Sequence, residues 1–301
     1  MIDRRKFIQY AGAQALLTTI PAVATARSAK LDTRLIPGTT EPMGIIGLGN
    51  SRAFIDNDVA TSTQLLDIFL EHGGTYVDVS GSSRMTVGKI VSDRNAQQQT
   101  LLGNYLSGQD ESELRTEIAA LQRVQGDGPL DLAMLRSVDD LARRADEFRA
   151  LKSDGLVRYV GIGRSHQSFY PGMMKLIENE VVDFIQVNYS MMEPEAADRI
   201  LPMAVDNGIA VVINRPFLNG DYFGIVKGHE LPEWAAEFDC ESWAQFSLKY
   251  IIAHPGVNCV LTETANPKHA LDNLGAGVGR LPDDATRVRM RQHLLAIANK
   301  N

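Results

Sequence analysis

Short apolar segments alternate with amphipathic segments along most of the chain. The first apolar segment covers residues 43–49 and ends at a glycine, and others follow at residues 75–80, 100–106, 130–138, 157–163, 183–189, 209–217 and 257–263. The segments between them carry apolar residues at helical spacing, and they typically end at a glycine. Nearly apolar strands, each followed by an amphipathic helix, are typical of a parallel sheet that is buried on both faces.

The number of these units predicts how the sheet is closed. Eight strand–helix units within about 250 residues match the size of a (β/α)8 barrel. We therefore expect an α/β protein with a single domain, a TIM barrel over residues 33–300. The alternative is an open, doubly wound sheet, which should have a GxGxxG turn after its first strand. The stretch at residues 47–53, GLGNSRA, has only the first two glycines of that pattern, and we expect no helix to begin there.

The N-terminal residues have the layout of an export signal. Arg4 and Arg5 come first, a modest apolar run follows at residues 11–20, and small residues surround Ala24 and Ala26. A basic start, an apolar middle and an A-x-A end are typical of a twin-arginine signal peptide. The apolar run is much shorter than the roughly 20 residues that span a bilayer.

We therefore expect a signal peptide at residues 1–26, a linker at 27–32 and the barrel at 33–300. This interpretation makes the twin-arginine export machinery a partner and the periplasm the location of the mature protein, which then has no membrane span. The alternative is an amphipathic N-terminal helix that stays attached.

Charge and cysteine content narrow the possible partners. The formal net charge is −7 at pH 7, which argues against a nucleic-acid or anionic-membrane surface because such surfaces require an excess of Lys and Arg.

Cys240 and Cys259 are the two cysteines. They can pair in an oxidising compartment, but Cys259 lies in an apolar run and is better interpreted as a small buried residue. Without a CxxC or a histidine cluster, we expect no metal site.

Four stretches in order along the chain resemble the aldo/keto reductase family. They are GLVRYVGIGRSH at residues 155–166, DFIQVNYS at 183–190, GIAVVINRPFLNGDYF at 208–223 and HPGVNCVLTETANPKHALDN at 254–273. The resemblance implies a (β/α)8 barrel that reduces carbonyl compounds with NADPH. It also implies a tyrosine as the acid, a lysine and an aspartate that tune it, and a histidine that orients the substrate oxygen.

The resemblance identifies the aspartate but finds no tyrosine after it. Asp78 matches the family's aspartate, and Ser83 stands where the tyrosine is expected. If the loop is shorter in this chain, Ser80 is the matching residue instead. Neither serine is a phenol, and we expect no other side chain at these positions to supply an acid of suitable pKa.

The lysine and the histidine of the family are also replaced. Tyr105 stands at the lysine position, or Asn104 if the alignment slips by one residue, and Arg136 stands at the histidine position. We take Asp78, Tyr105 and Arg136 as the candidate catalytic residues. With Arg136 close by, the pKa of Tyr105 can fall far enough for acid–base chemistry. The alternative for Tyr105 is a packed ring with a solvated hydroxyl.

The resemblance also assigns cofactor contacts, several of which are altered. Gly163 and Arg164 replace the Ser-Asn pair that holds the nicotinamide carboxamide, and Glu263 stands at the residue that faces the 2′-phosphate. A carboxylate repels a phosphate, so Glu263 disfavours NADPH, and NADH, which lacks the 2′-phosphate, is better tolerated. The loss of the Ser-Asn pair weakens the binding of either nucleotide. The absence of any cofactor is an alternative. The candidate cofactor-binding residues are Arg164, Gln186, Asn214, Arg215, Asp272 and Asn273.

Three arginines follow predicted strands. Arg136, Arg164 and Arg215 are expected to surround one barrel mouth, because each comes directly after a strand. Guanidinium groups suit carboxylates and phosphates, so the hypothesis is a pocket for an anionic small molecule. The alternative is that each arginine pairs with a nearby acid such as Asp139 or Glu193.

These observations leave three hypotheses for function. The first is an oxidoreductase of the aldo/keto reductase type with a rebuilt site, which uses NADH or NADPH on a small carbonyl or hydroxy substrate. The second is a cofactor-independent lyase or isomerase in which Tyr105 or His166 moves a proton. The third is a non-catalytic protein that binds an anionic small molecule.

Overall fold

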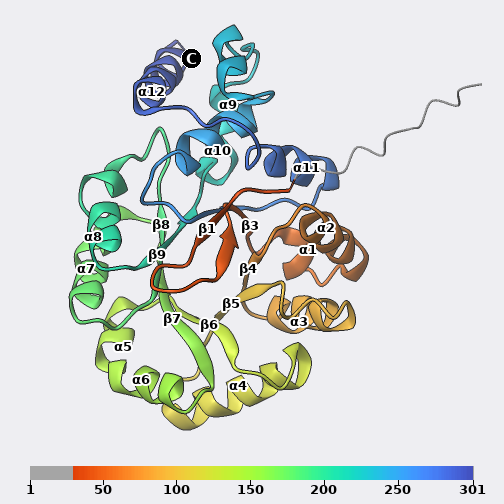
Figure 1. Ribbon diagram of the computed structural model, residues 1–301, viewed down its shortest axis with the longest axis vertical. Helices are drawn as coiled ribbons and strands as arrows, with labels where there is room; N and C mark the ends of the chain where they lie inside the picture. The colour runs from red at the N-terminus through yellow and green to blue at the C-terminus, as the bar shows by residue number, and fades with distance from the viewer. Residues whose placement is uncertain (1–29, 301) are drawn as a thin grey trace, which may run out of the picture.

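A closed barrel of parallel strands forms the centre of the molecule (Figure 1). The computed structural model describes residues 30–300, and the predicted signal peptide at residues 1–26 lies outside them. The strands follow one another around the barrel in chain order, and the last pairs with the first. They are β3 (Ile46–Leu48), β4 (Tyr76–Val79), β5 (Leu101–Tyr105), β6 (Leu130–Leu135), β7 (Val157–Gly163), β8 (Phe184–Asn188), β9 (Ala210–Asn214) and β10 (Cys259–Thr262). The predicted (β/α)8 barrel is confirmed.

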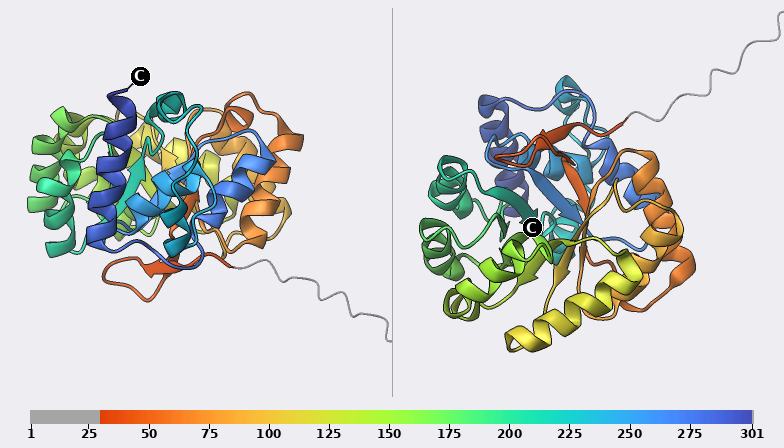
Figure 2. Two further views of the ribbon diagram at one scale, coloured as in Figure 1. Left: turned by 90° about the horizontal axis from the view of Figure 1, so that it is seen from above. Right: turned by 60° about the horizontal axis from the view of Figure 1, so that its bottom comes forward.

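Helices surround the barrel and cover the outer face of its strands (Figure 2). The α-helices are α1 (Arg52–Ile55), α2 (Val59–Glu71), α3 (Ser83–Asp93), α4 (Glu111–Gln125), α5 (Val138–Arg143), α6 (Ala145–Ser153), α7 (Tyr170–Glu178), α8 (Ile200–Asp206), α9 (Asp221–Ile225), α10 (Trp243–Ile252), α11 (Pro267–Gly275) and α12 (Asp284–Ala298). Short 3-10 helices are η1 (Gln167–Phe169), η2 (Glu195–Asp198), η3 (Leu218–Gly220) and η4 (Glu233–Phe238). The expectation that no helix begins after the first barrel strand is wrong, because the Ser51 hydroxyl accepts from the backbone N–H of Phe54 and starts α1.

The sequence determines these elements in two ways. Strands such as β4, β5 and β8 are buried at every position. This is expected because helices cover the outer face of the sheet and the barrel interior covers its inner face. Helices begin where a carboxylate accepts from the N–H three residues later, as Asp58, Asp110 and Asp283 do. The barrel interior is filled by inward side chains, among them Tyr76, Leu101, Tyr105, Leu132, Met134, Phe184, Val212 and Leu261.

A two-stranded hairpin closes the end of the barrel at which the strands begin. Its strands are β1 (Thr33–Leu35) and β2 (Pro42–Gly44), which pair antiparallel. Ile36 and Met43 are buried in the same cluster as the barrel interior. The hairpin therefore acts as a plug for this end of the barrel, and the sequence pattern did not predict it.

Residues 31 and 32 belong to the folded domain and not to the predicted linker at 27–32. Leu31 is buried and its N–H donates to the His72 carbonyl over 2.8 Å. The N–H of Asp32 donates to the Gly277 carbonyl over 2.9 Å. The start of the described chain is thereby fixed against α2 and the segment after α11.

The two cysteines are separate buried thiols. Cys259 lies in the barrel interior and Cys240 in the outer core, and neither forms a disulfide within the part of the chain described here. Cys259 therefore has the role of a small buried residue, one of the two possibilities that the sequence left open.

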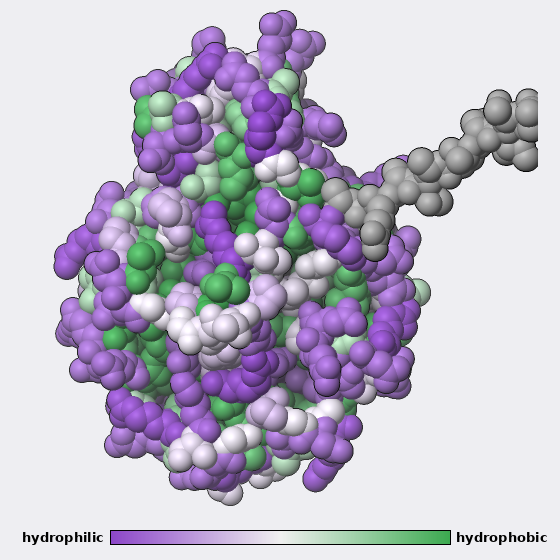
Figure 3. Space-filling view, viewed as in Figure 1, coloured by the Kyte–Doolittle hydropathy of each residue, from purple (hydrophilic) through white to green (hydrophobic). Residues whose placement is uncertain are grey.

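The face that carries the hairpin is largely hydrophilic, with small hydrophobic areas between polar side chains (Figure 3). None of the helices within residues 30–300 combines the length and the apolarity needed to cross a membrane.

Candidate functional site

A cavity of about 670 Å³ opens at the end of the barrel where the strands terminate. A (β/α)8 barrel places its functional side chains at this end. The buried side chains of Asp78 and Gln186 form the floor of the cavity, and exposed or partly exposed polar and apolar side chains surround it. The charged lining residues are Asp78, Arg136, Arg215 and Glu263; the amides include Asn50, Gln186 and Asn214; and the apolar ones include Ile55, Phe217 and Phe223.

Asp78 is the central titratable group of this floor. Its side chain points inward from β4 and the residue is 6% exposed, and burial raises its pKa to about 7. The Arg136 charge lowers this pKa, the Glu263 charge raises it, and hydrogen bonds with Gln186 and Tyr76 lower it slightly. Asp78 therefore exchanges its proton near neutral pH.

Tyr105 points into the barrel beside Asp78. Its hydroxyl donates to Gln186 Oε1 over 2.5 Å, and the guanidinium of Arg136 lies 3.9 Å from the centre of its ring. Burial raises the pKa of Tyr105 well above its ordinary value, Asp78 raises it further, and the opposing effects of Arg136 and Arg164 are smaller. The expectation of a lowered pKa for Tyr105 is therefore wrong, because burial outweighs the nearby positive charge.

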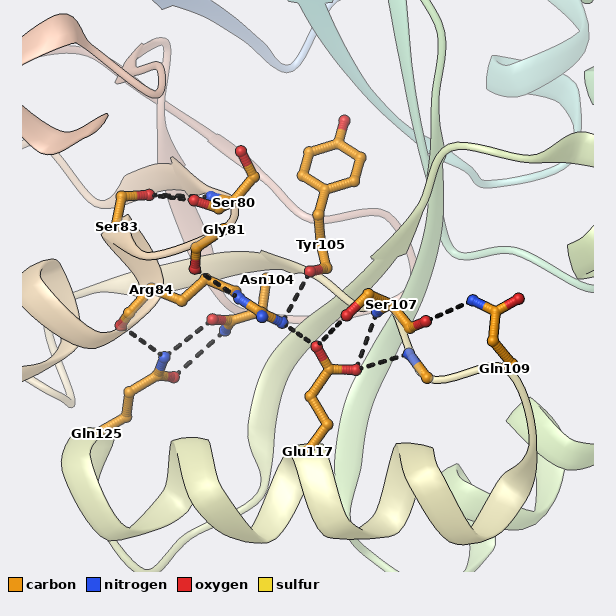
Figure 4. A network of polar contacts seen from close by, with 11 residues as sticks. Ser80, Gly81, Ser83, Arg84, Asn104, Tyr105, Ser107, Gln109, Glu117 and Gln125 are labelled. Atoms are coloured by element: carbon orange, nitrogen blue, oxygen red, sulfur yellow. Dashed lines mark hydrogen bonds and ion pairs between the residues drawn. The ribbon is translucent and has the colours of Figure 1, made fainter. Parts of the chain in front are cut away.

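Asn104, the other residue considered for the lysine position, points away from the barrel interior (Figure 4). Its amide exchanges two hydrogen bonds with Gln125 of α4, over 2.8 and 3.2 Å. The Tyr105 carbonyl accepts from Arg84 Nη1 over 2.9 Å, and Arg84 also pairs with Glu117. These contacts hold the end of β5 firmly and establish that Tyr105, and not Asn104, faces the site.

The two serines considered for the tyrosine position have structural roles. The Ser83 hydroxyl donates to Asn50 Oδ1 over 2.6 Å and accepts from the Ser80 N–H over 3.0 Å, which fixes the turn before α3. A buried phenol lies nearby instead, because the Tyr76 hydroxyl approaches Asp78 Oδ1 at 3.4 Å. Sequence reasoning missed Tyr76, although residues two apart on a strand face the same side.

The three arginines do not converge on one point. Arg136 and Arg215 line the cavity, whereas the Arg164 guanidinium stacks on the Phe169 ring, 3.4 Å from its centre. Arg215 forms an ion pair with Glu193 at 3.3 Å, so the alternative of local pairing is confirmed for Arg215. The expected ring of three arginines is wrong, and the cavity has no excess of positive charge that would select an anion.

Glu263 is part of the mouth. It lines the cavity with Asp78 and Arg136, and its side chain lies over Gly49, where a Cβ would be 2.4 Å from Glu263 Cγ. Burial raises the pKa of Glu263, while Arg136 opposes that shift. One arginine thus stands near two carboxyl groups that both hold their protons more tightly than usual.

Asp272 and Asn273, two of the candidate cofactor-binding residues, lie on α11. Asp272 accepts from the Ser242 hydroxyl and from Gln245 Nε2, each over 2.8 Å. Asn273 is buried and 4% exposed. Asp272 thus joins α11 to α10, and both oxygens of its carboxylate are occupied by protein donors.

The positions that the family uses for the nicotinamide carboxamide do not fit that group as they lie here. A Cβ on Gly163 would be 1.9 Å from the Tyr105 hydroxyl and 2.8 Å from Gln186 Oε1. Gln186 Oε1 already accepts from Tyr105, and Asn214 Nδ2 donates to the Arg164 carbonyl over 3.0 Å. Gln186 Oε1 and Asn214 Nδ2, two of the groups implied for the cofactor, are therefore occupied by protein atoms.

Two polar groups of the cavity lining lack a partner. Asn214 Oδ1 and Arg215 Nε are buried and have no hydrogen-bond partner among residues 30–300. Buried polar atoms are rarely left unpaired in proteins, so this part of the lining suits a polar ligand.

His166 does not take part in the cavity. It is exposed, and its Nδ1 accepts from the Ser168 N–H over 3.2 Å at the start of η1. Within the described residues, no cluster of three or more His, Cys, Asp or Glu side chains is arranged to hold a metal ion.

Comparison with known proteins gives a consistent family and fold. The model of the aldo/keto reductase family matches residues 43–288. A search of curated protein sequences found no match.

Among solved structures, aldo-keto reductase AKR11C1 from Bacillus halodurans, in its holo form, has 19% identity and a TM-score of 0.70, over 89% of this chain and 96% of that chain. An aldo-keto reductase from Klebsiella pneumoniae in complex with NADPH has 17% identity and a TM-score of 0.71, over 88% and 95%. The glycerol dehydrogenase AKR11B4 from Gluconobacter oxydans has 19% identity and a TM-score of 0.67, over 90% and 97%. At these identities the likeness supports the fold.

Proposed function

Since the chain belongs to the aldo/keto reductase family but carries serines where the resemblance places the tyrosine, we propose that it catalyses proton transfer on a small hydroxy-carbonyl compound, as an isomerase or lyase. The observation that carries this proposal is Asp78, a buried carboxyl whose pKa is about 7, on the floor of an open cavity. A general acid–base group works best when its pKa is close to the working pH. Asp78 meets that condition, whereas Tyr105 does not.

The chemistry follows from two charged groups of the cavity, Asp78 and Arg136. Ionised Asp78 removes a proton from the carbon next to a carbonyl; the C–H electrons form a carbon–carbon double bond, and the carbonyl electrons move to oxygen. Arg136 stabilises the resulting enolate oxygen. Transfer of the α-hydroxyl proton to the enolate oxygen, and return of the proton from Asp78 to the former carbonyl carbon, complete an isomerisation.

The lining of the cavity favours a neutral, polar substrate. The Arg136 charge is opposed by Asp78 and Glu263, and that of Arg215 is opposed by Glu193. Amide groups on the wall can bind hydroxyl groups, and the aromatic rim can cover an apolar face of the ligand. A polyhydroxy aldehyde or ketone has this chemistry.

A second candidate is carbonyl reduction with a nicotinamide cofactor. The family match favours it, and so does the aldo-keto reductase from Klebsiella pneumoniae that was solved in complex with NADPH. In this case Asp78 would be the acid in place of the missing tyrosine. The contact between Tyr105 and Gln186 stands against this candidate, because it occupies the carboxamide position.

Isotope exchange tests the proposed proton transfer. The mature protein, residues 27–301, is incubated in heavy water with a panel of small hydroxy aldehydes and hydroxy ketones, and loss of the α-proton signal is followed by NMR. We expect exchange with at least one compound and a loss of about 100-fold or more in Asp78→Asn. His166→Gln is the control and should leave the rate unchanged, since His166 lies outside the cavity.

The pH dependence of the same exchange gives a second test. Because Asp78 must be ionised to act as a base, the rate should rise with pH through a midpoint near its pKa of about 7. Glu263→Gln should lower this midpoint, since it removes a neighbouring negative charge, and Arg136→Met should raise it. No exchange with any compound, or shifts of the opposite sign, would contradict the proposal.

We also propose that the protein is exported to the periplasm by the twin-arginine machinery. Replacing both arginines, Arg4→Lys and Arg5→Lys, should block export, since the pathway reads the pair. Cell fractionation and immunoblotting should then find the full-length protein in the cytoplasm, whereas the control Lys6→Gln should still give a shortened periplasmic form. A shortened periplasmic product from the double variant would argue against this route.

A further inference from the structure

Gly163 and Tyr105 are complementary in shape. Gly163 ends β7 and pairs in register with Gln186 of β8. A Cβ on Gly163 would stand 1.9 Å from the Tyr105 hydroxyl oxygen, far inside the usual contact distance of about 3.5 Å. The hydroxyl therefore fills the space that any side chain at position 163 would need.

Tyr105 is held in this position from several sides. Its hydroxyl donates to Gln186 Oε1 over 2.5 Å, and the Arg136 guanidinium covers its ring at 3.9 Å. The residue is 5% exposed, and Arg84 donates to its carbonyl. Movement of the ring would break the hydrogen bond to Gln186 and the stacking on Arg136 together.

The same contact determines the orientation of Gln186. A tyrosine hydroxyl donates to the oxygen of an amide, so the amide nitrogen of Gln186 is left to donate to Asp78. Gln186 thus joins Tyr105 to Asp78, and both ends of its amide are occupied by protein groups. A ligand carboxamide cannot pair with Gln186 unless Tyr105 leaves.

We propose that Tyr105, in combination with Gly163, closes the part of the mouth that would receive a nicotinamide ring, so that small hydroxy-carbonyl compounds enter and a dinucleotide does not. This inference goes beyond the proposed proton transfer, since it concerns access and not the role of Asp78. It makes Tyr105 the residue that determines which ligands the barrel mouth accepts.

Cofactor titration tests the closure. Unaltered mature protein and the variants Tyr105→Leu and Tyr105→Met are titrated with NADPH and NADH, and cofactor fluorescence and Tm are recorded. We expect no binding to the unaltered protein, and binding with a Tm increase of several degrees in either variant that folds. Tyr159→Leu is the matched control and should not bind either nucleotide. Tyr159 is a partly buried tyrosine of β7 whose hydroxyl donates to Glu41, and it lies outside the cavity.

Two outcomes would overturn the closure. One is NADPH or NADH binding to the unaltered protein, and the other is a folded Tyr105 variant that still excludes both nucleotides. Either result leaves the isotope exchange by Asp78 to be judged separately, because that assay contains no nucleotide.

A double-mutant comparison tests the shape complementarity without any ligand. Gly163→Ser should lower Tm by many degrees in the unaltered protein, but by much less when Tyr105→Leu has removed the hydroxyl. Gly277→Ser is the control: a Cβ there meets Leu31 Cδ2 at 2.4 Å. Leu31 belongs to the outer core and Tyr105 to the barrel interior, so the effect should be equal in both backgrounds. Equal effects of Gly163→Ser in the two backgrounds would refute the pairing.

Discussion

Replacing Asp78 by asparagine should stabilise the protein at alkaline pH and have almost no effect at about pH 4, near the pKa of an unperturbed aspartate. In the unfolded chain this carboxyl ionises near 3.8, whereas burial in the folded protein raises its pKa to about 7. Between these values the unfolded state loses its proton and the folded state keeps it, so stability falls as pH rises. Above pH 7 the full cost of a buried carboxylate is present.

The size of this effect follows from the shift. A difference of about three pKa units corresponds to at most roughly 4 kcal/mol, and asparagine, which carries no charge, avoids that cost. Thermal melting across the pH range measures it as a Tm increase of several degrees at alkaline pH. A gain that is equal at acid and alkaline pH would show that the pKa of Asp78 is not raised.

Asp239, an exposed aspartate, provides a control because its pKa is lowered in the folded protein instead of raised. Asp239 accepts two hydrogen bonds from the Arg280 side chain, at 2.6 and 3.1 Å, and these bonds hold its pKa below the usual value. Asp239→Asn should therefore bring no stabilisation at alkaline pH. The contrast between the two variants separates a specific effect of burial from a general effect of removing negative charge from an acidic protein.

Replacing Arg34 by methionine should destabilise the protein by about 2–4 kcal/mol. Arg34 extends from the hairpin to the C-terminal end of α10, where Nη1 donates to the carbonyls of Val257 and His254 and Nη2 to that of Ile252 over 2.5 Å. Carbonyls at a helix end have no partner within the helix, and a positive charge there is favourable. Methionine retains the apolar stem and leaves the three carbonyls without this donor.

Chemical denaturation with urea measures this loss. The surface variant Arg52→Met is the control, because Arg52 pairs with Asp56 and their side chains are 78% and 56% exposed. Its effect should stay within about 0.5 kcal/mol. Similar midpoints for the two variants would mean that Arg34 does not tie the hairpin to α10.

The barrel could be predicted because its strands are buried on both faces and therefore leave a strong apolar pattern. The first strand shows the limit of this reasoning. Residues 43–49 have the pattern of a single strand, yet the structure divides them between β2, which pairs with β1, and β3, which joins the barrel. A continuous apolar run carries no information about which partner each half pairs with.

The position of the cavity at the ends of the strands could be predicted, but the arrangement of the side chains that line it could not. Asp78 and Gln186, which the family resemblance had indicated, lie in barrel strands and line the cavity. The direction in which a longer side chain points could not be predicted from the sequence. Arg164, for example, stacks on Phe169 outside the cavity. The pKa of Tyr105 depends on burial, which the neighbouring Arg136 alone does not reveal.

The hairpin at the closed end of the barrel also gives the molecule an orientation. The chain enters the fold there, whereas the cavity opens at the far ends of the strands; Figure 2 shows the hairpin on one side of the barrel, next to the start of the described chain. A protein coupled to a solid support through its N-terminus would therefore present the mouth to the solution. Immobilisation in this way leaves the site accessible for ligand screening.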